Sequence, residues 1–329
     1  MILTVRGIVQ LQSVAGVRRA AAPQGLVNLD DRLTLSADAS VQLVFLSDWH
    51  KEWVRPGREV TNATDGCEPA DAVRERDTSI PMTFARLPKG TFYMGWNGVP
   101  GSAKKMEIKE EFEIAAHDVT QGQWEAVMGN NPSHFSRTGN GRNSVLDISD
   151  EELKLFPVEC VSWNDCQEFL KKLNEKERGN RWVYRLPSEV EWEYSCLGGA
   201  TSEADCSYHF YLDKPTNDLS SKQANFNGNF PQGNGEKGPY LERTTRLGAY
   251  PSNKLGLCDM HGNVLQWCVN PDDPNATGEA HPVRKSIRGS GWDGLASFCW
   301  AANPSSYPSS TRANQVGLRL ARVSSAPGK

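Results

Sequence analysis

Three segments of the chain have the hydrophobic and polar pattern of short helices that begin at a capped residue. Thr120, Ser162 and Ser188 each stand three residues before an amide or acidic side chain, which is the spacing of a reciprocal cap at a helix N-terminus. Gly129 and Gly198 stand where the first and third helices should end in a left-handed residue. The second helix carries one apolar stripe with the spacing of a buried face: Cys166, Phe169, Leu170 and Leu173.

The first 62 residues have the alternation of β-strands instead. Extended segments are predicted at 8–16, 32–35 and 40–46, and the last of them places three apolar residues on one face: Val41, Leu43 and Phe45. Residues 63–80 are polar and without periodicity, so they predict a linker. Residues 81–325 are predicted to form one unit, with short strands and long loops after about residue 200.

Three patterns within residues 1–62 carry a resemblance of their own. They are G-x-V, G-L-x(3)-D-D-R-L-T and D-A-S-V-Q-L-V-F-L. Together they resemble the small β domain of iron-dicitrate-sensor (FecR-like) proteins. An unrelated β-rich extension would show the same alternation, so both interpretations stay open.

The composition narrows the class of protein. Charged residues make up 23% of the chain and the formal net charge is −4 without a basic stripe, which argues against a nucleic-acid ligand. No apolar run reaches the ~18 residues of a membrane span. The opening residues lack the apolar core of a secretory signal, so we expect a cytoplasmic location by default. The 8 cysteines are scattered and include no CxxC pair, so we expect mostly reduced thiols and no dedicated zinc site.

Blocks of sequence from residue 82 onward carry a second resemblance. In order, they include FARLPKGTFYMG, FEIAAHDVTQGQW, RLPSEVEWEY, GLCDMHGNV, IRGSGW and VGLRLARV. Their order and spacing resemble the formylglycine-generating enzyme, or sulfatase-modifying-factor, superfamily over residues 82–323. The resemblance implies an α+β fold, a loop-rich variant of the C-type lectin fold, here with a small N-terminal β domain before it.

Several residues of these blocks are expected to stabilise the fold. A loop-rich fold needs large side chains that anchor its loops, and four tryptophans stand beside capping residues and glycines: Trp124, Trp163, Trp192 and Trp267. We therefore predict that these four pack in the core. Arg185 is predicted to form a buried ion pair with Glu191 or Glu193, which would specify the fold more than stabilise it.

The same resemblance implies where a catalytic centre would lie. The family's named activity oxidises a substrate cysteine to formylglycine, with Cu(I) held between two thiolates. The second thiolate position coincides with Cys299, but the first coincides with Gly294. The family's Gly-Gly-Ser is also replaced by Gly289-Ser290-Gly291. One thiolate cannot form the two-coordinate site, so we expect no copper, and we interpret Cys299 as a small buried residue.

Two structural calcium sites are also implied by the resemblance, although the module requires no cofactor. One would use Asn225 with the carbonyl group of Phe226. The other would use four positions of the GLCDMHGNV block and its continuation: Asp259, Gly262, Val264 and Gln266. Because a glutamine replaces the family's glutamate in the second set, only one carboxylate is left, and calcium should bind weakly there.

The C-terminal segment 289–316 combines aromatic and small polar residues with only two formally charged side chains, Asp293 and Arg312. It leads into VGLRLARV at 316–323, where apolar residues alternate with Gly317 and Arg319 and predict a closing strand. A disordered tail is therefore not expected, and SSYPSSTRANQ is too polar for a core. We predict an ordered surface, because the same residue types dominate antibody paratopes.

This segment also resembles the variable proteins of diversity-generating retroelements, in which selected positions change on a fixed lectin-like scaffold. The fixed frame would be Arg288, Gly289, Trp292, Ala296, Cys299, Gly317, Arg319 and Ala321. The predicted ligand-binding residues are Asp293, Leu295, Ser297, Phe298, Trp300, Ala302, Asn303, Ser305, Ser306, Tyr307, Ser309, Ser310 and Arg312, and Gly294 and Ala313 would be changeable as well. An ordinary family member whose segment does not vary is the alternative.

These observations predict a non-catalytic module that binds a protein or other macromolecular ligand. Phe298, Trp300 and Tyr307 are the expected main contacts, because buried aromatic residues dominate interface energies. Two alternatives stay open. One is a copper-dependent oxidase or another enzyme that depends on Cys299, and the other is the sensory domain of a signalling assembly, to which the FecR-like segment points.

Overall fold

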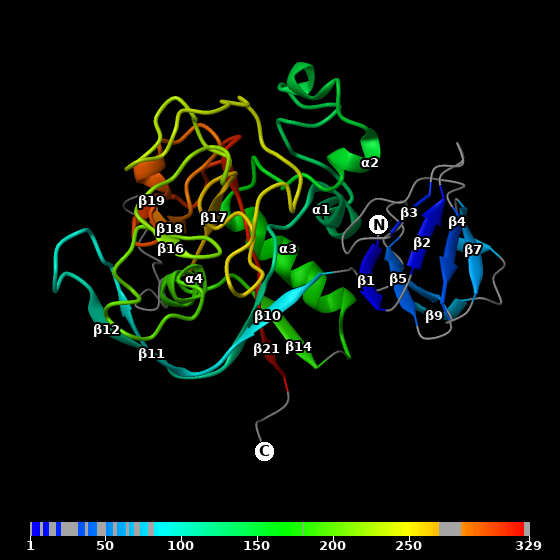
Figure 1. Cartoon of the computed structure of the whole chain (residues 1–329), viewed down its shortest axis with the longest axis horizontal. Helices are drawn as coiled ribbons and strands as arrows, with labels where there is room; N and C mark the ends of the chain where they lie inside the picture. The colour runs from blue at the N-terminus through cyan, green and yellow to red at the C-terminus, as the bar shows by residue number, and fades with distance from the viewer. Residues whose placement is uncertain are drawn as a thin grey trace. The chain divides into compact units, whose positions relative to one another are not determined.

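The chain forms two units in the computed structural model, Met1–Pro81 and Met82–Lys329 (Figure 1). In the first unit the structure describes residues 2–6, 9–12, 18–20, 32–36, 39–44, 51–54, 58–63, 66–68 and 73–77. In the second unit it describes residues 82–179, 181–269 and 284–325. Within these ranges no helix is long and apolar enough to cross a membrane.

The described strands of the first unit pair into two antiparallel sheets, with the orders β1-β5-β6-β9 and β3-β2-β4-β7-β8. The strands are β1 (Ile2–Arg6), β2 (Val9–Gln12), β3 (Arg18–Ala20), β4 (Arg32–Leu35), β5 (Ser40–Val44), β6 (Lys51–Val54), β7 (Glu59–Ala63), β8 (Gly66–Glu68) and β9 (Val73–Asp77). Val41 and Leu43 are buried on the face that their alternation predicted. Phe45, the third member of that face, lies outside the described residues.

Two of these strands lie where the sequence predicted a linker. Residues 63–80 contain β8 and β9, which form the edges of the two sheets. The sequence of β9 is VRERD, and charged side chains are typical of edge strands, where they disfavour pairing with another chain. The polar composition that predicted a linker is therefore that of a sheet edge.

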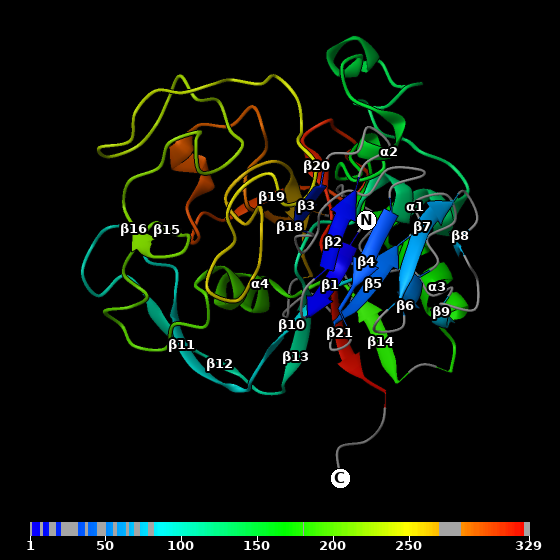
Figure 2. The ribbon, with the colours of Figure 1, turned by 45° about the vertical axis from the view of Figure 1, so that its right-hand side comes forward.

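The second unit contains two four-stranded sheets, with the orders β10-β13-β21-β14 and β19-β18-β17-β20, and two two-stranded ribbons, β11-β12 and β15-β16, within its described residues. The strands are β10 (Phe84–Leu87), β11 (Gly90–Met94), β12 (Lys104–Ile108), β13 (Phe112–Ala115), β14 (Trp182–Arg185), β15 (Phe210–Tyr211), β16 (Pro215–Thr216), β17 (Leu265–Trp267), β18 (Arg284–Arg288), β19 (Ser305–Pro308), β20 (Val316–Gly317) and β21 (Ala321–Ser324). Between α4 and β17 the chain is mostly loop, as the green-to-yellow trace in Figure 2 shows. The glycine-rich and asparagine-rich sequence predicted this.

The helices begin at the predicted caps. They are α1 (Gln121–Met128), α2 (Asp150–Leu153), α3 (Trp163–Lys176) and α4 (Glu189–Cys196), with short 3-10 helices η2 (Arg142–Val145) and η3 (Ala296–Cys299). Thr120, Ser162 and Ser188 each form a complete capping box with the residue three positions later. Gly129 and Gly198 adopt the predicted left-handed conformation, with φ of 79° and 67°. The apolar stripe of α3 is fully buried, as predicted.

Most of the tryptophans expected in the core are there. Trp124, Trp192 and Trp267 are at most 2% exposed, whereas Trp163 is half-buried under the ammonium group of Lys285. Of the two predicted partners of Arg185, the structure selects Glu191, with nitrogen–oxygen distances of 2.7 and 2.6 Å. That pair is only partly buried, because Arg185 keeps 32% of its side-chain surface exposed.

The predicted closing strand over 316–323 is interrupted. β20 pairs in parallel with β17, whereas β21 pairs antiparallel with β13 and β14 in the other sheet. The connecting residues Leu318 and Leu320 are both fully buried, and so is Arg319 between them. The alternation predicted one continuous strand, but the chain crosses the core here, from one sheet to the other.

We predict that removing the cap of α3 weakens the fold more than removing the cap of the exposed α2. Ser162→Ala should lower the free energy of unfolding by about 1–2 kcal/mol, because the Asp165 amide loses its acceptor. Ser149→Ala, the matched control at the exposed start of α2, should cost about 0.5 kcal/mol. Urea unfolding of the full chain measures both, and equal losses would contradict the prediction.

Candidate functional site

The C-terminal segment 289–316 is anchored to the unit by the buried guanidinium group of Arg288. Its Nη1 lies 3.1 Å from Glu189 Oε1, and its Nη2 donates to the carboxylate of Glu193. The same Nη2 donates to the carbonyl oxygen of Ala301, within the segment, at 2.7 Å. Burial raises the pKa of Glu193 and the charge of Arg288 opposes that shift. The pair is therefore a structural anchor that positions the segment.

Exposure along the segment separates a frame from a surface. Ala296, Cys299 and Ala301 are at most 1% exposed. The other residues assigned to the frame are buried too, apart from the half-buried Trp292: Arg288, Gly289, Gly317, Arg319 and Ala321. Each of the predicted ligand-binding residues is exposed or half-buried. The segment is thus an ordered surface that lies on a buried frame.

The aromatic residues predicted as main contacts differ in how much of each side chain is free. Phe298, on η3, is 54% exposed. Trp300 is half-buried, because its ring stacks on that of His209 with centroids 3.7 Å apart, and its Nε1 donates to Gln232 Oε1 at 2.6 Å. Tyr307 is half-buried on β19. Phe298 and Trp300 therefore share one end of the surface, and Tyr307 lies on a separate strand.

Arg312 connects the segment to α3. Its Nε and Nη2 donate to the two carboxylate oxygens of Asp165, each at 2.7 Å. Partial burial favours a higher pKa for Asp165, but hydrogen bonds from Arg312 and Ser162 outweigh it and hold that pKa below its ordinary value. Arg312 is consequently committed to an ion pair within the protein and contributes little free charge to the surface.

Cys299 lies in the frame as a protonated thiol. Its side chain is fully buried, and its Sγ donates to the carbonyl oxygen of Leu295 at 3.5 Å. Burial raises the pKa of this thiol to about 12, although a hydrogen bond with Ser290 opposes the shift. Thiolate is the form that attacks substrates or binds metal, so this environment disfavours both activities.

Ser290 occupies the space that a second thiol would need. A Cβ placed on Gly294 would lie 2.2 Å from Ser290 Oγ, which is far inside van der Waals contact. Ser290 itself has a φ of 68°, a left-handed conformation that costs energy in a residue with a side chain. A Cβ on Gly291 would meet the Cβ of Gln315 at 2.5 Å. Packing therefore disfavours a side chain at either Gly291 or Gly294, beside Ser290.

The oxygen of Gln266 that was expected to bind calcium already has two donors. Gln266 Oε1 accepts from Trp192 Nε1 at 2.7 Å and from Arg319 Nε at 2.9 Å, and Gln266 Nε2 donates to the carbonyl oxygen of Asp259 at 3.0 Å. Burial raises the pKa of Asp259 to about 7, with the charge of Arg319 opposing it. The guanidinium group supplies the positive charge beside these oxygens, so the set does not fit a calcium ion.

At the other implied calcium site, the side-chain nitrogen and the backbone carbonyl group of Asn225 are hydrogen-bonded within the protein. Asn225 Nδ2 donates to Arg243 O at 2.9 Å and to Asn263 Oδ1 at 3.1 Å, and the carbonyl group of Asn225 accepts from Asn263 N. Phe226 is fully buried, and a Cβ on Gly262 would lie 2.4 Å from the Asn225 carbonyl oxygen. Across the described residues, no group of three or more His, Cys, Asp or Glu side chains is placed to hold a metal ion.

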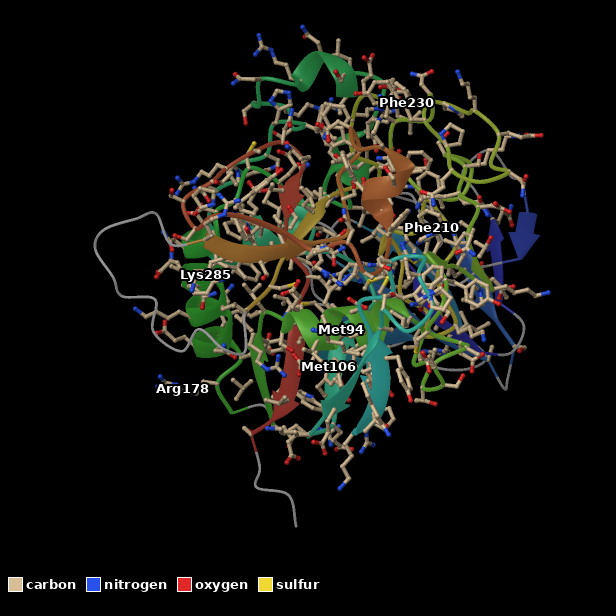
Figure 3. All side chains as sticks on the ribbon, turned by 90° about the vertical axis from the view of Figure 1, so that its left-hand side faces the viewer. Met94, Met106, Arg178, Phe210, Phe230 and Lys285 are labelled. Atoms are coloured by element: carbon tan, nitrogen blue, oxygen red, sulfur yellow. The ribbon has the colours of Figure 1, made fainter. Side chains whose placement is uncertain are left out.

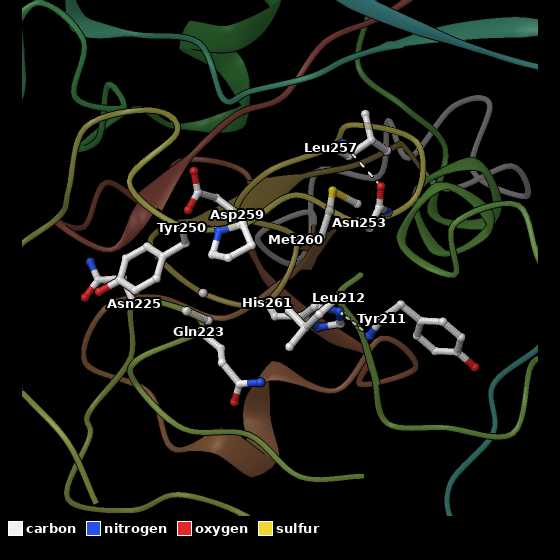
Figure 4. Close-up of a pocket in the computed structure, with 13 residues that line it drawn as sticks. Tyr211, Leu212, Gln223, Asn225, Tyr250, Asn253, Leu257, Asp259, Met260 and His261 are labelled. Atoms are coloured by element: carbon white, nitrogen blue, oxygen red, sulfur yellow. Dashed lines mark hydrogen bonds between the residues drawn. The ribbon is translucent and has the colours of Figure 1, made fainter. Parts of the chain in front are cut away.

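The pocket in Figure 4 belongs to this frame. Its volume of about 10 Å³ has room for one water molecule rather than an organic ligand. His261 on its wall accepts from the amide of Tyr211 through Nε2 at 2.9 Å and donates to Cys299 O through Nδ1 at 2.8 Å. Burial lowers the pKa of His261 to about 4. Both ring nitrogens of this neutral histidine are used, so it positions Cys299 and is not available as a base.

Sequence reasoning missed three residues that contact the candidate surface. His209 and Gln232 support Trp300 from two different loops. Phe230 is 54% exposed, and its carbonyl oxygen accepts from the amide of Ala296 at 3.2 Å. These residues lie in loops without periodicity, so the sequence carries no signal for their position beside residues that follow much later in the chain.

The family comparison covers most of this second unit. A family model described as "Sulfatase-modifying factor enzyme 1-like domain" matches residues 69–324. The chain belongs to this family. The match of the sulfatase-modifying-factor-like domain begins beyond the first 62 residues, so their resemblance to FecR-like proteins stays a prediction.

Curated relatives of the sulfatase-modifying-factor-like domain differ in their names. The formylglycine-generating enzyme of Streptomyces coelicolor is 29% identical over 280 residues, covering 78% of this chain and 82% of the relative. "Chaperone protein LppX" of Paenibacillus barcinonensis is 27% identical over 250 residues, covering 64% and 80%. "Inactive C-alpha-formylglycine-generating enzyme 2" of Mus musculus is 29% identical, covering 72% and 70%. One of these relatives is therefore named as an inactive protein.

Solved structures confirm the α+β, loop-rich C-type lectin-like fold. Treponema denticola variable protein 1 matches with a TM-score of 0.52 and 22% identity, covering 73% of this chain and 94% of the other. PvdO from Pseudomonas aeruginosa matches with a TM-score of 0.52 and 24% identity, covering 73% and 93%.

We predict that Gly294→Cys does not restore a copper site. The new Cβ would clash with Ser290 Oγ, so the variant should lose about 1–3 kcal/mol of stability and show no tight Cu(I) binding. Gly294→Ala is the matched control with the same clash and no thiol. Adding Ser290→Gly should recover most of the loss in both backgrounds. A double-mutant cycle by urea unfolding measures this, and additive losses would show that Ser290 is not the obstacle.

We predict that calcium is not needed for stability. A calcium ion bound at a hundred times its Kd would add about 2.7 kcal/mol, which corresponds to a Tm increase of several degrees in a domain of this size. Because Arg319 and Trp192 engage Gln266, thermal unfolding of the full chain in EGTA and in excess calcium should give the same Tm. A clear increase with calcium, absent with magnesium, would contradict this expectation.

Proposed function

We propose that the second unit is a non-catalytic binding module that presents residues 293–313 to a protein ligand. The observation that supports this function most directly is that exposed and buried positions of the segment form two distinct sets. Every position expected to contact a ligand reaches the surface, while Ala296, Cys299 and Ala301 are buried beneath. Such a surface can change residue by residue without disturbing the frame, as in the variable proteins that the segment resembles.

The chemistry of the segment fits protein recognition. Aromatic side chains such as Phe298 and Trp300 offer large contact areas at low entropy cost, and the serine and asparagine residues around them adapt their hydrogen bonds to a partner. Interface cores are depleted in charge and enriched in aromatic residues. Segment 293–313 has two charged side chains, Asp293 and Arg312, and Arg312 is paired with Asp165. A nucleic-acid ligand would need several cations, which this segment does not offer.

The buried thiol argues against the alternative of an oxidase. Cys299 is protonated and inaccessible, and the neighbouring position that would hold a second thiol is Gly294, closed by Ser290. The relative from Mus musculus, named as an inactive enzyme, is consistent with a family scaffold that has uses other than oxidation.

We predict that exposed aromatic residues of the segment carry partner binding. The immobilised full chain should retain a protein from an extract of its source cells, and Phe298→Ser should lower the affinity for that protein about tenfold or more, or about 1.4 kcal/mol. Leu146→Ser is the matched control, because Leu146 is a 71% exposed apolar residue outside the segment. The control should bind like the wild type.

The same preparation tests the oxidase alternative. With Cu(I), oxygen and a cysteine-containing peptide, the wild-type chain should consume no oxygen above that of Cys299→Ala. Retention of the partner by Phe298→Ser, or oxygen uptake that disappears in Cys299→Ala, would reject the proposed function.

A further inference from the structure

Two exposed apolar side chains outside segment 293–313 lie on loops that contact the segment or its support His209. The most exposed large apolar residues of the second unit's described part include Val99 at 59% and Phe230 at 54%. Val99 lies between β11 and β12, and Phe230 lies in the long loop between β16 and β17. Leu146 and Val183 are also exposed, at 71% and 43%, but they lie on η2's C-terminal side and on the edge strand β14. Of these four residues, Phe230 lies on a loop that is hydrogen-bonded to the candidate surface, and Val99 lies on a hairpin that packs on His209, the support of Trp300.

The turn that carries Phe230 is hydrogen-bonded to the segment just before η3 and at the first residue of η3. Asn227 N donates to Gly294 O at 2.9 Å, and Ala296 N donates to Phe230 O at 3.2 Å. Gln232 accepts from Trp300 at 2.6 Å. Figure 3 shows Phe230 beside the orange ribbon of η3. Phe230 is therefore held next to the end of the segment that carries Phe298 and Trp300.

An aromatic stack fixes the second loop on the other side of Trp300. The rings of Trp300 and His209 stack at 3.7 Å, and the ring of Trp96 packs on His209 at 4.7 Å. The amide of Ala301 donates to His209 O at 2.8 Å. A Cβ on Gly98 would lie 3.7 Å from the His209 ring. The tip of the β11–β12 hairpin, including Val99, is thus packed against the same ring that supports Trp300.

These loops share the low charge of the segment. Residues 95–102 and 224–235 contain no Asp, Glu, Lys or Arg. Burial lowers the pKa of His209, which keeps the ring in the middle of the stack neutral near pH 7. These two uncharged loops and the segment, in which only Asp293 is a charged side chain without an ion-pair partner in Asp165, complement a largely uncharged apolar patch on a folded protein, and together they lack the cations that a nucleic acid requires.

We propose that Trp96, Val99, His209 and Phe230 form a fixed rim of the binding surface, which contacts the protein partner together with segment 293–313. The inference rests on the proposed binding function and extends it. Phe230 is held by backbone hydrogen bonds, so its apolar contact does not depend on the side chains of the segment, whereas His209 stacks on Trp300. Trp300, supported by His209 and Gln232, joins the rim to the segment.

Site-specific photo-crosslinking tests this proposal. The photoreactive residue p-benzoylphenylalanine is placed at one position per full-chain variant: 298 in the segment, 99 and 230 in the fixed rim, and 146 and 183 as exposed apolar controls elsewhere. Each variant is irradiated in an extract of the source cells, and the products are identified by mass spectrometry. We expect one and the same protein cross-linked from 298, 99 and 230, competed by unlabelled wild-type chain, and no such product from 146 or 183.

Affinity for the protein so identified provides a second readout. Phe230→Ser should weaken binding about tenfold at an unchanged Tm, and Val183→Ser should leave it unchanged. A product from 298 without one from 99 or from 230 would overturn the fixed rim and leave the proposed function standing. No product from 298 would contradict both. Cross-links that join two copies of this chain would assign the surface to self-association and overturn the proposal as well.

Discussion

The position of the C-terminal surface depends on two buried guanidinium groups. Arg288 donates to Ala301 O as well as to its carboxylate partners, and Arg319 donates to Ala115 O and Cys258 O as well as to Gln266. Burying such a charge costs several kcal/mol unless its donors are satisfied, so each arginine holds the loops around it in one arrangement. Because many of the acceptors are backbone oxygens, these contacts do not depend on which side chains the surface displays.

The packing of this frame bears on the choice between an oxidase and the proposed binding module. A two-thiolate centre requires an open cavity beside Cys299, whereas here Ser290 fills the space above Gly294 and its left-handed backbone keeps it there. The buried thiol of Cys299 is therefore left without room for a partner thiol beside it. What remains is a well-packed support beneath η3, which suits a rigid contact surface because less conformational entropy is lost on binding.

The helices could be predicted from the sequence because their determinants are local. The capping box of Ser162 and the stripe of α3 need no more than a few consecutive residues. The crossing at Arg319 could not be predicted, because a buried arginine among alternating apolar residues looks like the outer face of a strand. His209 and Phe230 were missed for a related reason. Their roles arise from stacking and hydrogen bonds with residues that follow more than sixty positions later, and loops give no periodic signal of such contacts.

The geometry of η3 shows how so short a segment separates frame from surface. A 3-10 helix has three residues per turn, so residues i and i+3 lie on the same side. Ala296 and Cys299 are such a pair and both are buried, whereas Ser297 and Phe298 between them are exposed. A change at either exposed position leaves the packing of the pair untouched. Changing Ala296 or Cys299 would instead alter the buried contacts with Phe210 and Phe226. In such a close-packed cluster, even one extra methylene group lowers stability. The pattern of tolerated change in this surface therefore follows from helix geometry, before any partner is considered.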